Sequence, residues 1–312
     1  EADFRSPFYS EIFAGIRAAA KQSGTADTVI YGESLDLSRF PGPGYEESVV
    51  GHLRTKYAQR PIDVIVSIGV TSAKFLQKRK QEIWPTAPVV YGFVPDLPET
   101  RALFLPDTTA VFARVTPAHL LNAARAIAPD LTRVVLVGDA WKNPLVYGHW
   151  KQDFAAMMPG LEVTDLSDAV LRDVRKQVAS LPDRSAILTS AMYSDGEGTY
   201  YSPASALALV AETANRPIVI TSDTFLGRSG VGGFLLMPEI IGREAGEVAM
   251  RILDGEAPSN IVPFGGDNVK PIFDWRQLKR WNVNEANLPP GSEVRFREPT
   301  FWGQYHWHVT IV

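Results

Sequence analysis

The chain lacks cysteine, has no long hydrophobic run and carries no large excess of either charge. Without cysteine among its 312 residues, it has no disulfide, catalytic thiolate or cysteine-ligated metal. No apolar run approaches the roughly 20 residues of a membrane-spanning helix. The net charge is -4 and no extended Lys/Arg block occurs, so we expect no nucleic-acid partner. What remains is a globular chain, 45% hydrophobic, long enough for two domains of ~100–200 residues.

Short β-branched runs alternate with longer amphipathic stretches along most of the chain. This alternation is typical of an α/β protein in which helices cover parallel sheets. We predict strands at 28–31, 64–67, 89–93, 110–112, 134–138, 161–163, 186–189, 217–221 and 233–237. Helices are predicted at 7–21, 46–57, 72–83, 116–127, 144–158, 169–180, 202–214 and 238–254.

The succession of strands and helices starts again at Thr116, which predicts two similar lobes with a boundary near residue 115. A lobe of this kind normally opens on a strand. Here residues 1–4 stand directly before the first predicted helix. We therefore expect the opening strand to be clipped from the sequence or supplied by only a few residues.

The last predicted helix, which contains several small residues, and the segments on either side of it resemble part of a known protein family. Residues 232–238, 242–249 and 251–258 are similar to the late part of type I periplasmic binding proteins, where the chain adds a helix to the first lobe and crosses the hinge again. An ordinary packing helix rich in alanine and glycine is the alternative, because small residues such as Gly242, Ala245, Gly246 and Ala249 permit close approach to a sheet. The resemblance implies two Rossmann-like lobes with parallel sheets and a multi-strand hinge. Their expected extents are 1–114 plus 238–262, 115–237 plus 263–283, and a tail at 284–312.

A second resemblance lies at the two ends of the chain. Residues 271–283 and 288–292 are similar to the end of the substrate-binding-like family of ABC transporters. With 5–9, 294–299 and 301–302 added, the chain resembles the extracellular sensor domain of bacterial membrane histidine kinases. That resemblance implies a domain on the periplasmic side of the inner membrane and a kinase region of the same polypeptide beyond residue 312. A homodimer is a possible assembly.

The final residues are consistent with the sensor interpretation. Trp302, Tyr305 and Trp307 are residue types found at membrane interfaces, and 309–312 could begin a spanning helix. The alternative is a C-terminal strand whose aromatic side chains pack on the core.

Ligands of open α/β sheets bind beyond the carboxyl ends of the strands, so two facing lobes would form one cleft. A glycine turn followed by hydroxyls at a helix start suits a carboxylate or another acceptor-rich group, although the same residues could be a plain helix cap. In the first lobe we expect the ligand to contact Asp3, Ser6, Phe8, Tyr9, Gly69, Val70, Thr71, Ser72, Phe93 and Val94.

Aromatic side chains are dense at the strand ends of the second lobe, where they could stack on a flat or apolar ligand or fill gaps between loops. The favoured ligand is an aromatic acid or an apolar, amino-acid-like molecule. The expected contacts are Asp139, Trp141, Tyr147, Ala191, Met192, Tyr193, Asp195, Ser222, Asp223 and Phe225.

Catalytic and metal-binding motifs are weak. The glycine-rich run 227–233 precedes a predicted strand and not a helix, so it lacks the helix dipole of a phosphate loop. His306 and His308 have no evident third metal ligand, and no Gly-x-Ser-x-Gly elbow occurs. Asp195 and Glu197 could pair as acid and base, but acidic residues among glycines are ordinary in loops. We expect no metal, no cofactor and no enzymatic activity.

Two functions remain, and both require a small-molecule ligand. The first is the sensor domain of a histidine kinase that closes on its ligand. The second is a free periplasmic substrate-binding protein of an ABC transporter. An α/β enzyme is a third hypothesis, for which the sequence shows no catalytic cluster.

Overall fold

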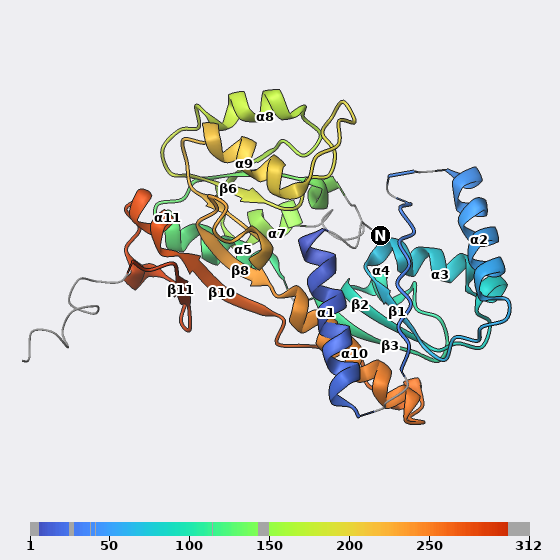
Figure 1. Ribbon diagram of the computed structural model, residues 1–312. Coiled ribbons are helices and arrows are strands. Elements are labelled where there is room, and N and C mark those ends of the chain that lie inside the picture. The colour runs from blue at the N-terminus through green and yellow to red at the C-terminus, as the bar shows by residue number, and fades with distance from the viewer. Residues whose placement is uncertain are drawn as a thin grey trace, which may run out of the picture.

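A computed structural model describes residues 6–24, 28–37, 39–40, 42–113, 115–142 and 150–298. Two sheets, each flanked by helices, lie side by side in Figure 1. The chain is therefore an α/β protein with two lobes, as the alternation of strands and helices predicts.

The first lobe is built on a four-stranded parallel sheet with the order β1-β2-β3-β9. Its strands are β1 (Ile65–Ile68), β2 (Val89–Pro95), β3 (Thr108–Ala113) and β9 (Phe264–Gly265). Its helices are α1 (Pro7–Gln22), α2 (Pro43–Tyr57), α3 (Val70–Ile83), α4 (Pro98–Arg101) and α10 (Pro238–Leu253). A 3₁₀ turn, η3 (Pro258–Asn260), lies between α10 and β9.

The second lobe is built on a seven-stranded sheet with the order β11-β10-β8-β7-β6-β4-β5, in which only the β8–β10 pair is antiparallel. Its strands are β4 (Arg133–Val137), β5 (Glu162–Asp165), β6 (Ser185–Thr189), β7 (Ile218–Val219), β8 (Gly232–Leu236), β10 (Val269–Asp274) and β11 (Glu293–Arg295). Its helices are α5 (Pro117–Ile127), α7 (Trp150–Met157), α8 (Leu171–Val178), α9 (Pro203–Thr213) and α11 (Trp275–Arg280). Short 3₁₀ turns are η1 (Asp139–Lys142), η2 (Asp223–Phe225) and η4 (Glu285–Asn287).

The chain passes between the two sheets three times, after β3, after β8 and after β9. Asn268, which is fully buried, connects all three crossings. Its side-chain amide donates to the backbone carbonyl of Phe112 at 3.0 Å, and its backbone carbonyl accepts from the N–H of Met237 at 2.9 Å. The same amide lies 3.1 Å from the carboxylate of Glu244 on α10. These bonds hold the hinge together.

Glycines let α10 pack directly against α1. A Cβ atom on Gly242 would lie 1.9 Å from the carbonyl oxygen of Ile12, and one on Gly15 would lie 2.1 Å from that of Glu239. Ala245 and Ala249 instead belong to the cluster that α10 forms with the sheet. The small residues of this helix therefore serve two faces: glycines toward α1 and alanines toward the sheet.

The strand predicted at 28–31 is wrong, because these residues form no ladder with β1 or any other described strand. Val29 and Tyr31 are 68% and 43% exposed, and only Ile30 packs on the core. β-branched residues favour a strand only where a neighbouring strand pairs with them.

The C-terminal part contributes elements that the sequence did not predict. β9 pairs with β3 of the first sheet, although residue 264 falls within the range expected for the second lobe. β11 pairs with β10, and Val294 of β11 and Leu288 pack on the second lobe, although β11 and Leu288 fall within the range expected for a tail. Residues 299–312, with their predicted interfacial aromatics and histidines, lie outside the described residues. Within the described part of the chain, no helix is long and apolar enough to cross a membrane.

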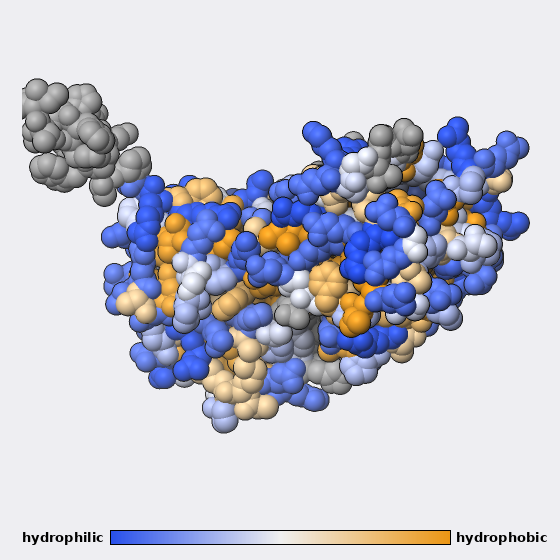
Figure 2. Space-filling view, turned by 90° about the horizontal axis from the view of Figure 1, so that it is seen from below, coloured by the Kyte–Doolittle hydropathy of each residue, from blue (hydrophilic) through white to orange (hydrophobic). Residues whose placement is uncertain are grey.

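Hydrophobic residues on the underside of the molecule form small patches separated by hydrophilic residues (Figure 2). Small apolar patches are ordinary on protein surfaces. In open α/β sheets, ligand sites lie at the edges where the strands end.

Candidate functional site

Three aromatic side chains of the first lobe, Phe8, Tyr9 and Phe93, gather near the end of β2. Phe93 has a φ of 53°, in the left-handed region, and the pairing of β2 with β3 shifts register around it. This bulge lets Phe93 leave the sheet while Val94 stays fully buried in the core. The Phe93 ring lies 4.8 Å from the ring of Phe8 in the first turn of α1, and Tyr9 lies 5.5 Å from Phe8. Strained backbone held by its surroundings is characteristic of ligand sites.

The start of α3 lies at the same edge, because the N–H of Gly69 donates to the carbonyl of Gly92 at 2.9 Å. The hydroxyl of Ser72 bonds back to the carbonyls of Ile68 and Gly69, at 2.8 and 2.9 Å. No side chain of the described residues caps the amides of the first turn. These N–H groups and the half-buried Thr71 can therefore receive an acceptor-rich group, whereas the Ser72 hydroxyl is occupied.

In the second lobe, Asp139 connects two strand ends. Its Oδ2 accepts from the N–H groups of Tyr193 and Ser194, at 2.5 and 3.2 Å, and its Oδ1 lies 3.1 Å from Lys142. Trp141 is only 8% exposed, and its indole N–H donates to the carbonyl of Val137 at 2.9 Å. The hydrogen bonds of the Asp139 and Trp141 side chains are therefore made within the second lobe.

Asp195 organises the loop that follows β6. This carboxylate, 5% exposed, accepts hydrogen bonds from the N–H groups of Leu171, Glu197 and Thr199 and from the Tyr201 hydroxyl, at 3.0–3.3 Å. Burial alone would raise the pKa of Asp195, but these four hydrogen bonds to the charged form lower it. Both oxygens of Asp195 are therefore occupied by hydrogen bonds, one of them from the backbone N–H of Glu197.

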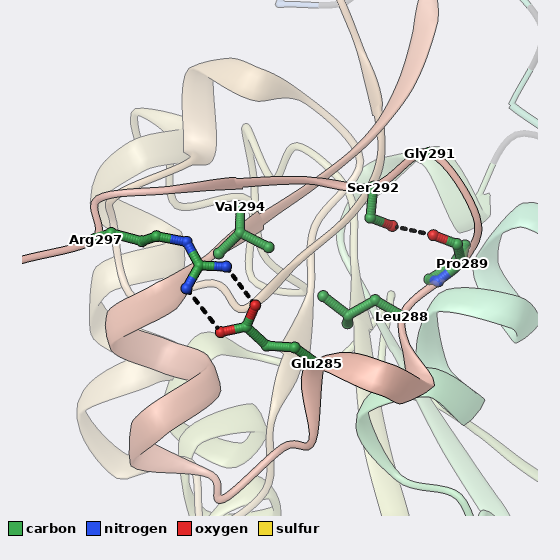
Figure 3. A pocket seen from close by; sticks show the side chains of 7 residues that line it. All are labelled: Glu285, Leu288, Pro289, Gly291, Ser292, Val294 and Arg297. Atoms are coloured by element: carbon green, nitrogen blue, oxygen red, sulfur yellow. Dashed lines mark hydrogen bonds and ion pairs between the residues drawn. The ribbon is translucent and has the colours of Figure 1, made fainter.

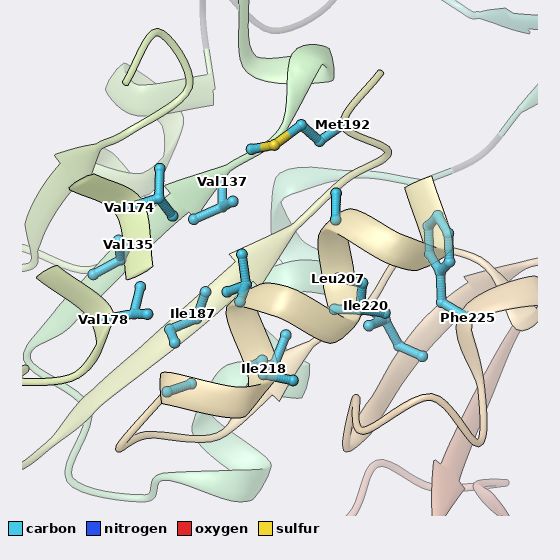
Figure 4. Close-up of a cluster of buried hydrophobic side chains, with 14 of the residues drawn as sticks. Val135, Val137, Val174, Val178, Ile187, Met192, Leu207, Ile218, Ile220 and Phe225 are labelled. Carbon is cyan, nitrogen blue, oxygen red and sulfur yellow. The ribbon is translucent and has the colours of Figure 1, made fainter. Parts of the chain in front are cut away.

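Three further predicted residues face the core or its border. Met192 and Phe225 are 2% and 8% exposed and lie among the apolar side chains of the second lobe (Figure 4). Ala191 is partly buried against the same cluster.

Charged groups from both lobes meet near Asp223, which follows β7. Burial raises the pKa of Asp223, the backbone N–H of Thr224 and the charge of Arg295 lower it, and the charge of Glu239 raises it. Its Oδ1 is buried and has no hydrogen-bond partner among the described residues. Its neighbour Ser222 is 3% exposed and bonds to Thr224.

Glu11 on α1 belongs to this group, although we did not predict it. Burial, followed by the charges of Asp223 and Glu239, raises the pKa of Glu11 to about 7. The sequence held one signal for it: Glu11 is three residues after Phe8 and so shares its face of the helix. Glu11 belongs to the first lobe and Asp223 to the second, so this electrostatic effect acts between the lobes.

The structure thus brings together two groups of the predicted residues. Phe8, Tyr9 and Phe93 form one group, and Ser222 and Asp223 lie in the loop that interacts with α1. Ser6 is half-buried directly before α1, and Tyr193 is half-buried beside Asp139. Asp3 and Tyr147 lie outside the described residues.

Two surface hollows lie elsewhere. One, of about 300 Å³, lies around Leu288 and Ser292 beside the ion pair of Glu285 with Arg297 (Figure 3). The other, of about 420 Å³, lies between α8 and α9. None of the predicted ligand contacts lines either hollow. The described residues contain no group of three or more residues that could hold a metal ion.

No protein-family model and no curated protein sequence matches the chain. Solved structures do match. One is described as the ABC domain in complex with L-Trp from Streptococcus pneumonia, at 14% identity and a TM-score of 0.67, covering 93% of this chain and 96% of that one. A ligand-free, open substrate-binding protein with adhesive properties from Clostridium difficile has 16% identity, a TM-score of 0.64, and coverage of 94% and 96%.

An ABC transporter solute-binding protein from Bacillus halodurans, with bound myo-inositol, is more distant. It has 11% identity, a TM-score of 0.52, and coverage of 83% and 93%. At identities this low, the structural similarity establishes only the architecture. The two lobes and the three crossings between them agree with that architecture. The chain has the type I periplasmic binding fold.

Proposed function

We propose that the chain binds a small organic solute between its two lobes and performs no chemistry on it. The observation that carries this proposal is the pair of Phe8 and Phe93, held by a strained bulge at the strand-end edge of the first sheet. The charge of Asp223 in the second lobe contributes to the raised pKa of Glu11, one helical turn after Phe8, which supports a common space between the two sheet edges. Ligands of open α/β folds bind at such edges.

The ligand class that these groups favour is an aromatic acid or an apolar, amino-acid-like molecule. The uncapped amides at the start of α3 suit an acid group, and the rings of Phe8 and Phe93 suit a flat or apolar one. The Streptococcus structure with L-Trp supports this class. The Bacillus structure with myo-inositol shows that related architectures also hold polyols, so polyols belong in any screen.

Binding between lobes produces a response only if the ligand prefers the closed arrangement. Moving an open-to-closed ratio from 1:99 to 99:1 needs about 5.5 kcal/mol of differential affinity. A ligand that contacts Phe93 in one lobe and Asp223 in the other gains contacts on closure, which is the required difference.

For the biological role, we propose an extracytoplasmic sensor domain of a membrane histidine kinase. The C-terminal resemblance supports it, and so does the position of β11: Arg295 on this strand interacts with Asp223. The segment around β11 therefore influences the charge of the loop that we expect to face the ligand. A free substrate-binding protein of an ABC transporter is the second candidate, which the solved neighbours fit equally well.

Ligand binding is tested by thermal-shift screening of the purified chain against amino acids, aromatic acids and polyols. A binder raises the melting temperature in proportion to mass action. The proposal predicts a concentration-dependent rise with at least one aromatic or apolar acid, confirmed by calorimetry. Binding of polyols alone would correct the ligand class, and turnover of a hydrolase substrate with no binder would reject the binding function.

The role is tested in the native gene product. If the chain belongs to a sensor, full-length protein in membrane vesicles changes its autophosphorylation when the ligand is added outside. A gene product that ends shortly after Val312 and supports uptake with a permease would instead establish the transporter component. Cross-linking of the full-length protein in the same vesicles shows whether the sensor is a homodimer.

A further inference from the structure

A hydrogen bond joins the two lobes away from the hinge. The hydroxyl of Tyr200 donates to the backbone carbonyl of Arg39 at 3.1 Å. Tyr200 lies in the loop between β6 and α9 of the second lobe, and Arg39 lies in the segment that leads into α2 of the first lobe. The two residues are 161 positions apart in the sequence.

The position of this contact determines what it can do. In Figure 1 the loop after β6 and the segment that enters α2 lie at the upper ends of the two lobes, whereas the chain crosses between the sheets lower down, at the start of α10 and of β10. When two bodies rotate about a hinge, the points farthest from it separate most. A hydrogen bond at the far rim therefore exists only while the lobes are close together.

Each side of the contact is also held by interactions within its own lobe. On the second lobe, a β-bridge joins Ser194 to Tyr200, and Asp195 accepts hydrogen bonds from the same loop. On the first lobe, the N–H of Arg39 donates to the carbonyl of Asp36 at 3.0 Å, and the ring of Phe40 lies 5.2 Å from that of Tyr45. None of these interactions involves the opposite lobe, and groups that are already held in place lower the entropic cost of a contact.

The Tyr200 side chain plays no part in the core, since it is 59% exposed. We propose that Tyr200 is a rim latch, whose hydroxyl bonds to the Arg39 carbonyl in the closed arrangement and so increases the affinity for a solute held between the lobes. The inference rests on the proposed binding function, which it deepens by naming a residue that sets the open-to-closed balance without contacting the ligand. Only the closed arrangement binds the solute fully, so the open fraction of the protein lowers the apparent affinity. A rim bond that raises the closed fraction therefore raises the apparent affinity.

The first test needs no ligand. The chain has no cysteine, so Lys78→Cys on α3 and Lys176→Cys on α8, both exposed positions of opposite lobes, accept spin labels selectively. The Tyr200→Phe variant removes only the hydroxyl, and its interlobe distance distribution should shift toward longer distances. Tyr31→Phe is the matched control, because the Tyr31 hydroxyl accepts its hydrogen bond from Arg60 within the first lobe.

The second test measures affinity with L-tryptophan as the probe. A neutral hydrogen bond contributes about 0.5–1.5 kcal/mol, so Tyr200→Phe should weaken binding about twofold to tenfold while Tyr31→Phe leaves it unchanged. Equal distance distributions for Tyr200→Phe, Tyr31→Phe and the parent protein would overturn the latch. A distance shift in Tyr200→Phe without binding of any screened solute would support the latch and reject the binding function, so the two failures are distinguishable.

Discussion

The ring of Phe93 lies 4.8 Å from that of Phe8, at an interplanar angle of 57°. This contact joins the end of β2 to the first turn of α1, which are 85 positions apart by residue number. It depends on a left-handed backbone at Phe93, a conformation that bulky residues rarely adopt. The side chain must therefore contribute something that glycine, the easier residue at this position, does not.

We expect Phe93→Ala to weaken binding of an aromatic acid about tenfold or more. Alanine keeps the left-handed position occupied but removes the ring, whose contacts with an aromatic ligand contribute about 0.5–1.5 kcal/mol beyond buried area. Isothermal titration calorimetry with the best thermal-shift hit measures the change. Phe296→Ala is the control, because the Phe296 ring lies over Arg276 in the C-terminal segment. Equal affinity loss in both variants would show that Phe93 has no specific role.

The sequence allowed a good prediction of the elements and their order. Buried parallel strands have continuous apolar runs, as at β4 and β6, and these were recognisable without any partner. The strand ends followed from the strands: Gly69 directly follows β1, Phe93 lies near the end of β2, and Asp223 follows β7. Their contact with a ligand stays a prediction. The strands β9, β10 and β11 were not predicted. β9 and β11 have only two or three residues each and depend on pairing partners distant in the sequence.

The direction of side chains could not be predicted. Trp141 and Met192 follow strands just as Phe93 does, yet both point into the core of the second lobe. The difference lies in the bulge at Phe93, which reverses the alternation of β2, and in the bond from the Trp141 indole to Val137. Neither the bulge nor the indole hydrogen bond can be recognised from residue composition or spacing. Glu11 was missed for the related reason that its partners Asp223 and Glu239 are brought near only by the fold.

We expect Gly242→Ala to destabilise the protein by about 2–4 kcal/mol, because its Cβ would collide with backbone. The nearest atom, the carbonyl oxygen of Ile12, would lie only 1.9 Å away and belongs to a helix that cannot rotate aside. Urea unfolding measures the loss. The matched control is Gly51→Ala on α2, where a Cβ meets nothing within 4 Å. Because alanine favours helices over glycine by about 0.8–1 kcal/mol, Gly51→Ala should be neutral or stabilising.

Glu11 should make stability depend on pH. Burial, with the charges of Asp223 and Glu239, raises its pKa from 4.5 to about 7 in the folded protein. Between these values the folded state holds more protons than the unfolded state, so the free energy of unfolding falls as pH rises from 4.5 to about 7. The contribution of Glu11 to the free energy of unfolding is therefore fully present below pH 4.5 and lost above about pH 7. Because the side chain is partly solvated, we expect an effect of about 1 kcal/mol.

The Glu11→Gln variant should remove this slope. It should be more stable than the parent protein above pH 7, where the parent carries an uncompensated charge, and should lose that advantage near pH 4.5. Glu247→Gln, an exposed position on α10, provides the control. Chemical unfolding at closely spaced pH values measures both variants, and an unchanged slope in Glu11→Gln would contradict the assignment.

The hinge offers a prediction that connects stability with motion. Asn268 is fully buried and its side-chain amide serves both the Phe112 carbonyl and the Glu244 carboxylate. Asn268→Ala removes the donor to the Phe112 carbonyl and one donor to the half-buried Glu244 carboxylate, which keeps the N–H of Asp267. We expect a loss of about 1–3 kcal/mol in the free energy of unfolding. Because the backbone bond from Met237 to residue 268 remains, the amides near Phe112 should exchange hydrogen faster than in the parent protein, and the amide of Met237 should change less. Asn260→Ala, at an exposed position after α10, should change neither stability nor exchange. Faster exchange spread evenly over both lobes, with none concentrated at the crossings, would show that Asn268 stabilises the protein globally and has no special function at the hinge.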